Sequence, residues 1–145
     1  MPQPLAIESV NHVARLTRHL EESRAFYRDV LGFRELARPN FKFPGAWLYN
    51  YGLQIHLIVD DAAPLEKGEI STRADHLALH VADISAAERS LIEHGIPYKS
   101  NYVADRDVTQ LFFHDPDGHH IELGCYPPVR EADVEQRAAS TPLPR

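Results

Sequence analysis

The stretch His114–Gly124, HDPDGHHIELG, has the pattern of a strand end, a tight turn and the start of a second strand. Pro116 presets the backbone angle that a type I turn needs at its second position, and Gly118 stands where the chain leaves the turn. The second strand carries one carboxylate, Glu122, between two apolar residues. Because side chains alternate along a strand, Glu122 faces the side opposite to these neighbours. The hairpin therefore presents an acidic group on one face of a sheet.

The chain contains an internal repeat whose equivalent residues lie 63 to 66 positions apart. His12 in the run NHV corresponds to His76 in DHL, and the Gly-Phe that ends the first predicted helix corresponds to a Gly-Ile pair. On the last strand of each half, His56 corresponds to Glu122. Hydrophobic periodicity gives each half the order strand, helix, strand, strand, strand. The sequence therefore predicts two tandem βαβββ modules.

These modules form one predicted α+β domain over residues 1–145. Module one covers about residues 6–60, a polar linker 61–74, module two about residues 75–125, and a C-terminal tail 126–145. Strands are expected at 7–17, 33–37, 46–51, 53–59, 75–81, 97–103, 108–114 and 119–124. Helices are expected at 19–31, at 86–94 with Asp83 or Ser85 as its cap, and at 130–138.

Composition and charge argue against several classes of function. A net charge of −6 disfavours nucleic acid or an anionic membrane as the main partner. No apolar run approaches the roughly 18 residues of a membrane span, and the N-terminal MPQPLAIESV lacks the pattern of a signal peptide. Cys125 is the only cysteine, so an intramolecular disulfide cannot form. We expect a soluble, cytoplasmic protein that acts on a small-molecule substrate.

Four residues with ligand-type side chains occupy the first and last strands of the two modules: His12, His56, His76 and Glu122. Imidazole and carboxylate groups suit a divalent ion such as Zn, Ni, Co, Mn or Fe. A single histidine in a strand is more often a core or surface group, but the repeat outweighs this for His12 and His76. His56 has a second interpretation, as a cavity residue that does not touch metal. We predict one divalent metal ion per site.

Other residues have weaker assignments. His80 and His120 share strand faces with His76 and Glu122, which makes them candidates for holding the ligands in place. The histidines expected to be solvated are His19, His94, His114 and His119. Candidates for either an apolar pocket or core packing are Phe41, Phe43, Trp47, Tyr49 and Phe113. If the substrate is anionic, one of Arg15, Arg34 and Arg38 should reach the site, whereas Arg28 is expected on a solvated helix face.

The chain resembles the vicinal oxygen chelate superfamily, which includes glyoxalase I, bleomycin-resistance proteins and extradiol dioxygenases. The resemblance covers nearly all of residues 7–126 and is carried by the runs NHVARLT, FYRDVLGF, LQIHL, DHLALHV and FHDPDGHHIEL. It implies paired βαβββ modules, a cup-shaped mixed sheet around one metal, and ligands at the four positions above. His56 stands where glyoxalase I has glutamate and the epimerases have glutamine. The runs GAWLY, IHL and QLFFHDPDG are most similar to glyoxalase-I-like proteins of plants and bacteria.

The resemblance implies a lyase or isomerase, in which a hemithioacetal becomes a thioester through an enediolate-type intermediate. Glu122 would be the catalytic residue that moves a proton. Three departures weaken the usual glutathione substrate. Leu16 and Asp60 stand where glyoxalase I has a glutathione-binding arginine and an asparagine, and the run YVADRDVTQ replaces a Gly/Lys-rich loop. His56 also removes the second carboxylate base.

Other members of the same superfamily remain alternatives. A metal-dependent thiol transferase uses the same His, His, Glu set, although its phosphonate-binding residues find no match here. A dioxygenase would have tyrosine where Phe112 stands, and an epimerase would have a second carboxylate in the run Ala46–Tyr51. A bleomycin-resistance-like protein binds a ligand without catalysis and generally lacks the metal ligands.

The way in which the modules pair determines whether the four predicted ligands come from one chain or from two. The two modules can close on each other within a chain, or each can pair with a module of a second chain. The resemblance favours the second arrangement, and two-fold homodimers are the commonest assembly. We therefore expect a homodimer in which His12 and His56 of one chain meet His76 and Glu122 of the other.

Overall fold

The computed structural model describes residues 1–138, and its first module runs from His12 to Val59. A helical segment follows the first strand, and three further strands follow the helical segment. The predicted single helix at 19–31 is instead a short α-helix that continues into a π-helical turn, η1. The elements are β1 (His12–Thr17), α1 (Leu20–Ala25), η1 (Phe26–Val30), β2 (Arg34–Leu36), β3 (Gly45–Asn50) and β4 (Leu53–Val59).

The second module repeats this order from His76 to Gly124. Its helix begins where Asp83 accepts a hydrogen bond from the backbone N–H of Ala86 at 3.0 Å, which confirms the predicted cap. The elements are β5 (His76–His80), α2 (Ile84–Glu93), β6 (Tyr98–Val103), the 3₁₀ turn η2 (Ala104–Arg106), β7 (Val108–His114), β8 (His120–Gly124), and α3 (Glu131–Ala138) in the tail.

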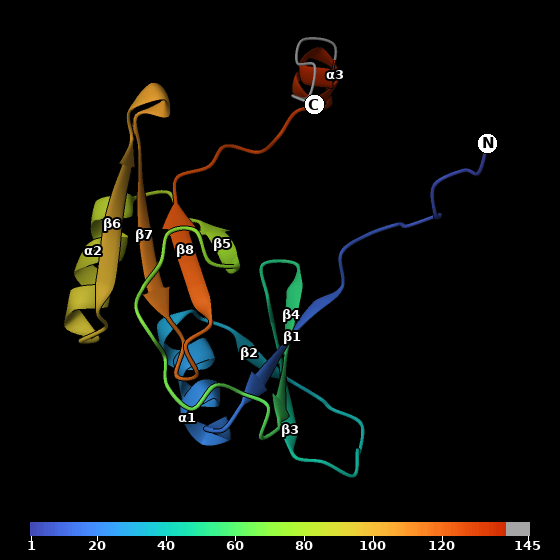
Figure 1. Cartoon of the computed structure of the whole chain (residues 1–145), viewed down its shortest axis with the longest axis vertical. Helices are drawn as coiled ribbons and strands as arrows, with labels where there is room; N and C mark the ends of the chain where they lie inside the picture. The colour runs from blue at the N-terminus through green and yellow to red at the C-terminus, as the bar shows by residue number, and fades with distance from the viewer. Residues whose placement is uncertain (139–145) are drawn as a thin grey trace.

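Each module forms its own four-stranded mixed sheet, in the orders β1-β4-β3-β2 and β5-β8-β7-β6. The first and last strands of each module pair in parallel, and the remaining pairs are antiparallel. Figure 1 shows the two sheets side by side, with α1 at the base of the second. The predicted α+β fold of duplicated βαβββ modules is therefore confirmed.

The first strand is shorter than predicted. It begins at His12, which pairs with Gln54 near the start of β4, so residues 7–10 find no neighbouring strand. These residues are exposed, and Figure 1 shows the N-terminal segment standing away from both sheets, as α3 also does. No helix within residues 1–138 is long and apolar enough to cross a membrane.

Both sheets turn one face toward a shared apolar core. Leu48 and Ile55 come from the first sheet, Phe113 and Ile121 from the second, and Tyr27 from η1 joins the same cluster. We call the opposite faces the ligand faces, because alternation along the strands places the predicted ligands there. Each strand thus separates the residues that pack from the residues that face the site.

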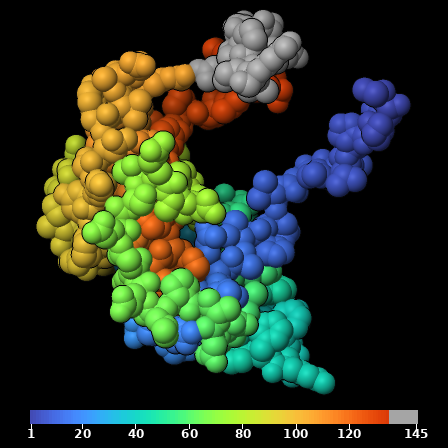
Figure 2. Space-filling view, viewed as in Figure 1, coloured from blue at the N-terminus to red at the C-terminus, as the bar shows by residue number. Residues whose placement is uncertain are grey.

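The turn of the opening hairpin ties the second module to the helical segment of the first. Asp117 accepts hydrogen bonds from the backbone N–H of Arg18 at 2.8 Å and from the hydroxyl of Ser23 at 3.0 Å. The linker is also anchored, since the Arg18 guanidinium donates to the carbonyl oxygen of Ala63 at 2.7 Å. Figure 2 shows the linker, in green, curving around orange residues of the second module that stay visible beside it. These contacts fix the two sheets relative to one another.

Candidate metal centre

The ligand face of the first sheet carries a stack of three rings. His12 and His56 come from the neighbouring strands β1 and β4, and their ring centroids lie 3.9 Å apart at an interplanar angle of 11°. Trp47, on β3 directly opposite His56, covers the other side of that ring at 4.1 Å and 7°. The structure therefore brings two predicted ligands together and places His56 between two aromatic planes.

Hydrogen bonds assign the tautomers of these two rings. An amide oxygen only accepts hydrogen bonds, so a ring nitrogen in contact with one carries the proton. His12 donates through Nδ1 to Asn11 Oδ1 at 2.7 Å, which leaves Nε2 free as a ligand atom. His56 donates through Nε2 to Gln54 Oε1 at 2.8 Å, so its free nitrogen is Nδ1. His56 would bind a metal through Nδ1, or through Nε2 after its ring turned away from Gln54.

The surroundings of His56 also favour the neutral form that a ligand needs. Burial lowers the pKa of His56, and the positive charges of His12 and Arg38 lower it further. A neutral imidazole offers a lone pair without first losing a proton.

The second sheet presents a histidine and a carboxylate face to face. His76 Nε2 lies 3.9 Å from Glu122 Oε2, on the adjacent strands β5 and β8. His76 donates through Nδ1 to the carbonyl oxygen of Ala74 at 2.7 Å, so Nε2 is the free nitrogen. A metal-binding histidine commonly has its second nitrogen fixed in this way. The ring of His76 also meets the ring of Phe112 edge-on at 5.5 Å.

A chain of amide hydrogen bonds holds Glu122, whose side chain is almost fully buried. Gln110 donates through Nε2 to Glu122 Oε1 at 2.8 Å and to the hydroxyl of Tyr126 at 3.1 Å. Asn101 donates in turn to Gln110 Oε1 at 2.7 Å. Burial raises the pKa of Tyr126, so its hydroxyl stays protonated beside the carboxylate. Oε1 is therefore fixed, and Oε2 is the oxygen that faces His76.

Gln110 and Tyr126 are not among the residues predicted from the sequence. Gln110 lies two residues before Phe112, which pairs with Glu122, so alternation across the hairpin already indicated a shared face. Tyr126 follows the last strand, and no periodicity places it. Its ring lies against Gly124, at a position where a Cβ atom would collide with it.

The remaining histidines correct two predictions. His114, expected in solvent, lies with its Nε2 3.1 Å from Nε2 of His120, and burial lowers the pKa of His114. His119, also expected in solvent, hydrogen-bonds through its ring to the carbonyl oxygen of Leu16 at 2.8 Å. The pairing of β7 with β8 and the return of the turn onto β1 leave both histidines only partly exposed. The predictions for His19 and His94 are confirmed, since both are exposed.

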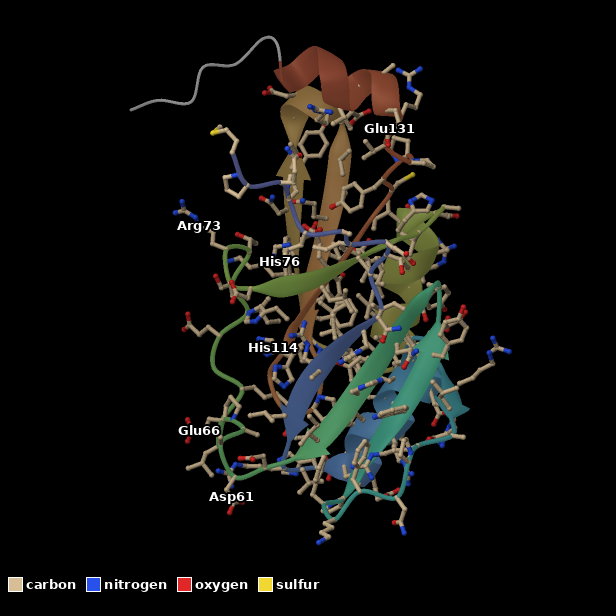
Figure 3. All side chains as sticks on the ribbon, turned by 90° about the vertical axis from the view of Figure 1, so that its right-hand side faces the viewer. Asp61, Glu66, Arg73, His76, His114 and Glu131 are labelled. Atoms are coloured by element: carbon tan, nitrogen blue, oxygen red, sulfur yellow. The ribbon has the colours of Figure 1, made fainter. Side chains whose placement is uncertain are left out.

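His80 and His120 accept hydrogen bonds from the backbone, and neither touches a predicted ligand through a hydrogen bond. His120 Nε2 accepts from the N–H of Ser71 in the linker at 2.9 Å, and His80 Nδ1 accepts from the N–H of Tyr126 at 2.8 Å. These contacts support the linker and the tail. Figure 3 shows His76 and His114 on the same side of the molecule, beside the linker.

The two pairs of predicted ligands stay apart within one chain. Among residues 1–138, no group of three His, Cys, Asp or Glu side chains is arranged so that it could hold a metal ion. Each pair nevertheless offers donors of the right chemistry, with free imidazole nitrogens on one sheet and an imidazole and a carboxylate on the other. Within one chain, the predicted ligands therefore form two separate pairs, which we call the half-sites.

Comparison with known proteins settles the family. Residues 9–123 match the family described as the Glyoxalase/Bleomycin resistance protein/Dioxygenase superfamily. The chain belongs to this superfamily. The vicinal oxygen chelate assignment made from the strand motifs is thereby confirmed.

Among the superfamily relatives, "Glyoxylase I 4" of Arabidopsis thaliana is 40% identical over 126 residues, covering 83% of this chain and 72% of the relative. "Metallothiol transferase FosB" of Lysinibacillus sphaericus is 27% identical over 122 residues, covering 82% of this chain and 83% of the relative. The crystal structure of a glyoxalase/dioxygenase from Nostoc punctiforme superposes with a TM-score of 0.68 at 26% identity, covering 88% of this chain and 97% of that one. These relatives carry names of different activities.

Proposed function

We propose that this protein is a divalent-metal-dependent enzyme of the glyoxalase I type, a lyase or isomerase acting on a small substrate that chelates through two neighbouring oxygen atoms. The observation that carries the proposal is the His76–Glu122 pair, in which a free imidazole nitrogen faces a carboxylate oxygen across 3.9 Å. The 40% identity to the relative named Glyoxylase I 4 supports the same class.

The residues that would hold the metal are His12, His56, His76 and Glu122. Bound there, a divalent ion would supply a Lewis acid that polarises the substrate oxygens. Imidazole and carboxylate donors suit Zn, Ni, Co, Mn and Fe alike, so the donor set selects a class of metal and no single ion.

Glu122 is the residue that would move the proton in this reaction. Its Oε1 accepts a hydrogen bond from the amide of Gln110, and its Oε2 faces His76 Nε2 at 3.9 Å on the ligand face. A carboxylate with one fixed oxygen keeps the other in a defined position, which favours proton transfer from the carbon next to a substrate carbonyl. The buried ring of Phe112 beside His76 keeps water from one side of this carboxylate.

We further propose a homodimer with two shared sites, in which His12 and His56 of one subunit complete the site of His76 and Glu122 of the other. The half-sites lie on different sheets that the contacts of Asp117 hold in place within one chain. The edge strands β1 and β5, which carry His12 and His76, each have one side that pairs with no other strand of residues 1–138. Chains tend to cover such edges, and a second subunit would do so.

Subunit mixing tests this arrangement. A His12→Ala chain is unfolded or dissociated and recombined with a Glu122→Ala chain, and metal content is measured in the isolated heterodimer. A shared site predicts one intact site per heterodimer, since the unaltered half-site of each chain meets that of the other.

The matched control combines a His76→Ala chain with a Glu122→Ala chain. Both substitutions affect the same half-site, so both sites of this heterodimer stay incomplete and no metal returns. If the first heterodimer also regains no metal after verified subunit exchange, the shared site is wrong.

A second candidate is metal-dependent thiol transfer, which the match to FosB and the absence of the expected glutathione contacts at Leu16 and Asp60 favour. The metal-loaded protein is assayed with a methylglyoxal–thiol hemithioacetal and with an epoxide plus thiol. Thioester formation supports the isomerase, whereas a thioether product supports the transferase.

A further inference from the structure

The loop after β2 carries an arginine onto the ligand face of the first sheet. Leu36 pairs with Trp47 in the register of β2 and β3, so Arg38, two residues later, continues on the face of Trp47. Its guanidinium carbon lies 4.8 Å from the ring centre of Phe41 and 5.0 Å from that of Phe43. The cation thus sits on two aromatic rings, a favourable electrostatic contact.

These rings continue the stack that contains the predicted ligands. Phe41 and Phe43 are stacked at 5.3 Å and 13°, and Phe41 lies 6.0 Å from Trp47. Trp47 in turn covers His56. An aromatic wall therefore runs from the first half-site to Arg38. Phe41 and Phe43 each keep 42% of their surface exposed, so a ligand can reach the far end of this wall.

Arg38 has no acidic partner among the side chains that the structure describes, which are those of residues 1–134. Its one hydrogen bond runs from Nη2 to the carbonyl oxygen of Phe43 at 2.9 Å, and its buried Nε has no partner. The Nε of Arg24 also lacks a hydrogen bond, but it lies 3.2 Å from Glu35. Other arginines that contact carboxylates are Arg18, with Asp61, Arg28, with Asp29, and Arg130, with Asp133. A half-buried guanidinium without a counter-charge is suited to bind an oxyanion.

Gly45 at the start of β3 makes this position possible. A Cβ atom there would collide with the backbone carbonyl oxygen of Leu57 and would also lie 2.9 Å from Arg38 Nη2, so a larger residue would disturb both the strand pairing and the guanidinium. Gly45 precedes Trp47 by two residues, which is about 7 Å along a strand. The charge therefore lies roughly one small-molecule length from the ring of His56.

We propose that Arg38, Phe41 and Trp47 form a subsite for an oxyanion, a carboxylate or a phosphate, at the end of the substrate remote from its chelating oxygens. The inference rests on the proposed function. The chelating end of the substrate lies at His12, and its apolar middle lies on Trp47 and Phe41. Of the other arginines considered from the sequence, Arg15 faces the core side, Arg28 pairs with Asp29, and Arg34 is exposed at the outer strand.

A structural role for Arg38 makes different predictions. The Arg38 guanidinium also holds the loop by its hydrogen bond to the carbonyl oxygen of Phe43, and it lies against the backbone of Gly45. A bracing role predicts that loss of Arg38 lowers stability, with no discrimination between charged and neutral ligands. An anion-binding role predicts such discrimination at unchanged folding.

Trp47 provides a direct readout, because it is the only tryptophan of the chain. The full-length protein, freed of metal by a chelator, is titrated with three probes while tryptophan emission is recorded. These are 3-phenylpropionate, its uncharged amide, and phenyl phosphate. The variants are Arg38→Met, Arg38→Lys and, as a matched control, Arg34→Met from the same sheet face. Thermal unfolding of each variant checks that it folds.

The expected result is saturable quenching by at least one anionic probe and about tenfold weaker binding of the amide, since a charged hydrogen bond is lost. Arg38→Met should weaken binding of that anion about tenfold, Arg38→Lys by less, and Arg34→Met should leave it unchanged. Comparison of the two anions distinguishes a carboxylate from a phosphate site.

Equal binding of the amide and both anions, or an unchanged affinity in a folded Arg38→Met protein, overturns the proposal. No quenching by any probe, in either the metal-free or the metal-loaded protein, also overturns it. Because the titration needs no metal, its outcome is independent of the subunit-mixing test of the metal site.

Discussion

The hydroxyl of Tyr27 donates a 2.8 Å hydrogen bond to Asp115 Oδ2 and so joins the helical segment of the first module to the hairpin of the second. Both side chains are at most 1% exposed. Burial and the negative charge of Asp115 raise the pKa of Tyr27 well above its usual value, so the hydroxyl remains a donor. The other oxygen of Asp115 accepts from the N–H groups of Asp117 and His119, which shapes the turn. One carboxylate thus links turn geometry to the packing of the modules.

Tyr27→Phe should lower the free energy of unfolding by about 1–3 kcal/mol, because a buried carboxylate loses a hydrogen bond. Urea unfolding measures this. Tyr102→Phe is a matched control, since Tyr102 donates to Asp107 at 2.7 Å in an exposed position. Its effect should stay within about 0.5 kcal/mol. Equal effects in the two variants would contradict the assigned role of Tyr27.

Replacement of Glu122 or His76 by Ala should weaken metal affinity about tenfold or more. Mutation of a residue that only hydrogen-bonds to a metal ligand already has an effect of this size. Elemental analysis of protein purified without chelator, followed by competition with a metal indicator, measures it. His94→Ala, at an exposed helix end, should bind metal normally. Full metal occupancy in a protein that lacks both Glu122 and His76 would refute the site.

Gln110→Leu removes the amide that fixes Glu122 Oε1 while keeping a similar volume. Metal affinity should fall about tenfold, as expected when a ligand loses the hydrogen bond that orients it. Tyr126→Phe keeps the Gln110–Glu122 bond, so its effect on metal affinity should be smaller. A Gln110→Leu protein with normal metal affinity would show that the carboxylate holds its position alone.

Stability of the metal-free protein should fall as the pH is lowered. Burial lowers the pKa of His56 and of His114, so the folded protein keeps both rings neutral at a pH where the unfolded chain already binds protons. The unfolded chain takes up its protons near pH 6.5, and each proton favours unfolding. The contribution of each neutral ring is therefore complete above that pH and is lost as the pH falls through the lower pKa of the folded state.

Urea unfolding of wild type between about pH 7.5 and 5.5 tests this pH dependence. His114→Gln should show a smaller loss of stability over that range than wild type. His94→Gln, altered at an exposed position, should match wild type. An identical pH dependence in His114→Gln and wild type would exclude His114 as a cause.

The repeat and the strand alternation predicted much of this architecture. Both are properties of residues close together in the sequence. The order Ile121-Glu122-Leu123 was therefore enough to predict that Glu122 faces the side opposite to its apolar neighbours. The start of β1 could not be predicted in this way, because it depends on where β4 begins to pair with His12. Residues 7–10 have the sequence pattern of a strand, but the pairing of β1 with β4 begins only at His12.

The candidate site was predictable in composition and less so in arrangement. The repeat pointed to His12 and His76, whereas the stacking of Trp47 on His56 depends on the register of β3 against β4. The partial burial of His114 likewise depends on the hairpin that sets His120 opposite it. Single-sequence patterns carry no information about such cross-strand neighbours until the register is known.

The alternation along β8 has a consequence for how such genes diverge. Ile121 and Leu123 belong to the packed core, while His120 and Glu122 face the ligand side. Substitutions at alternate codons of β7 and β8 can therefore alter the ligand face while the residues of the packed core stay the same. A library that randomises only Gln110, His114 and His120 would sample new specificities in descendants that all inherit the same core.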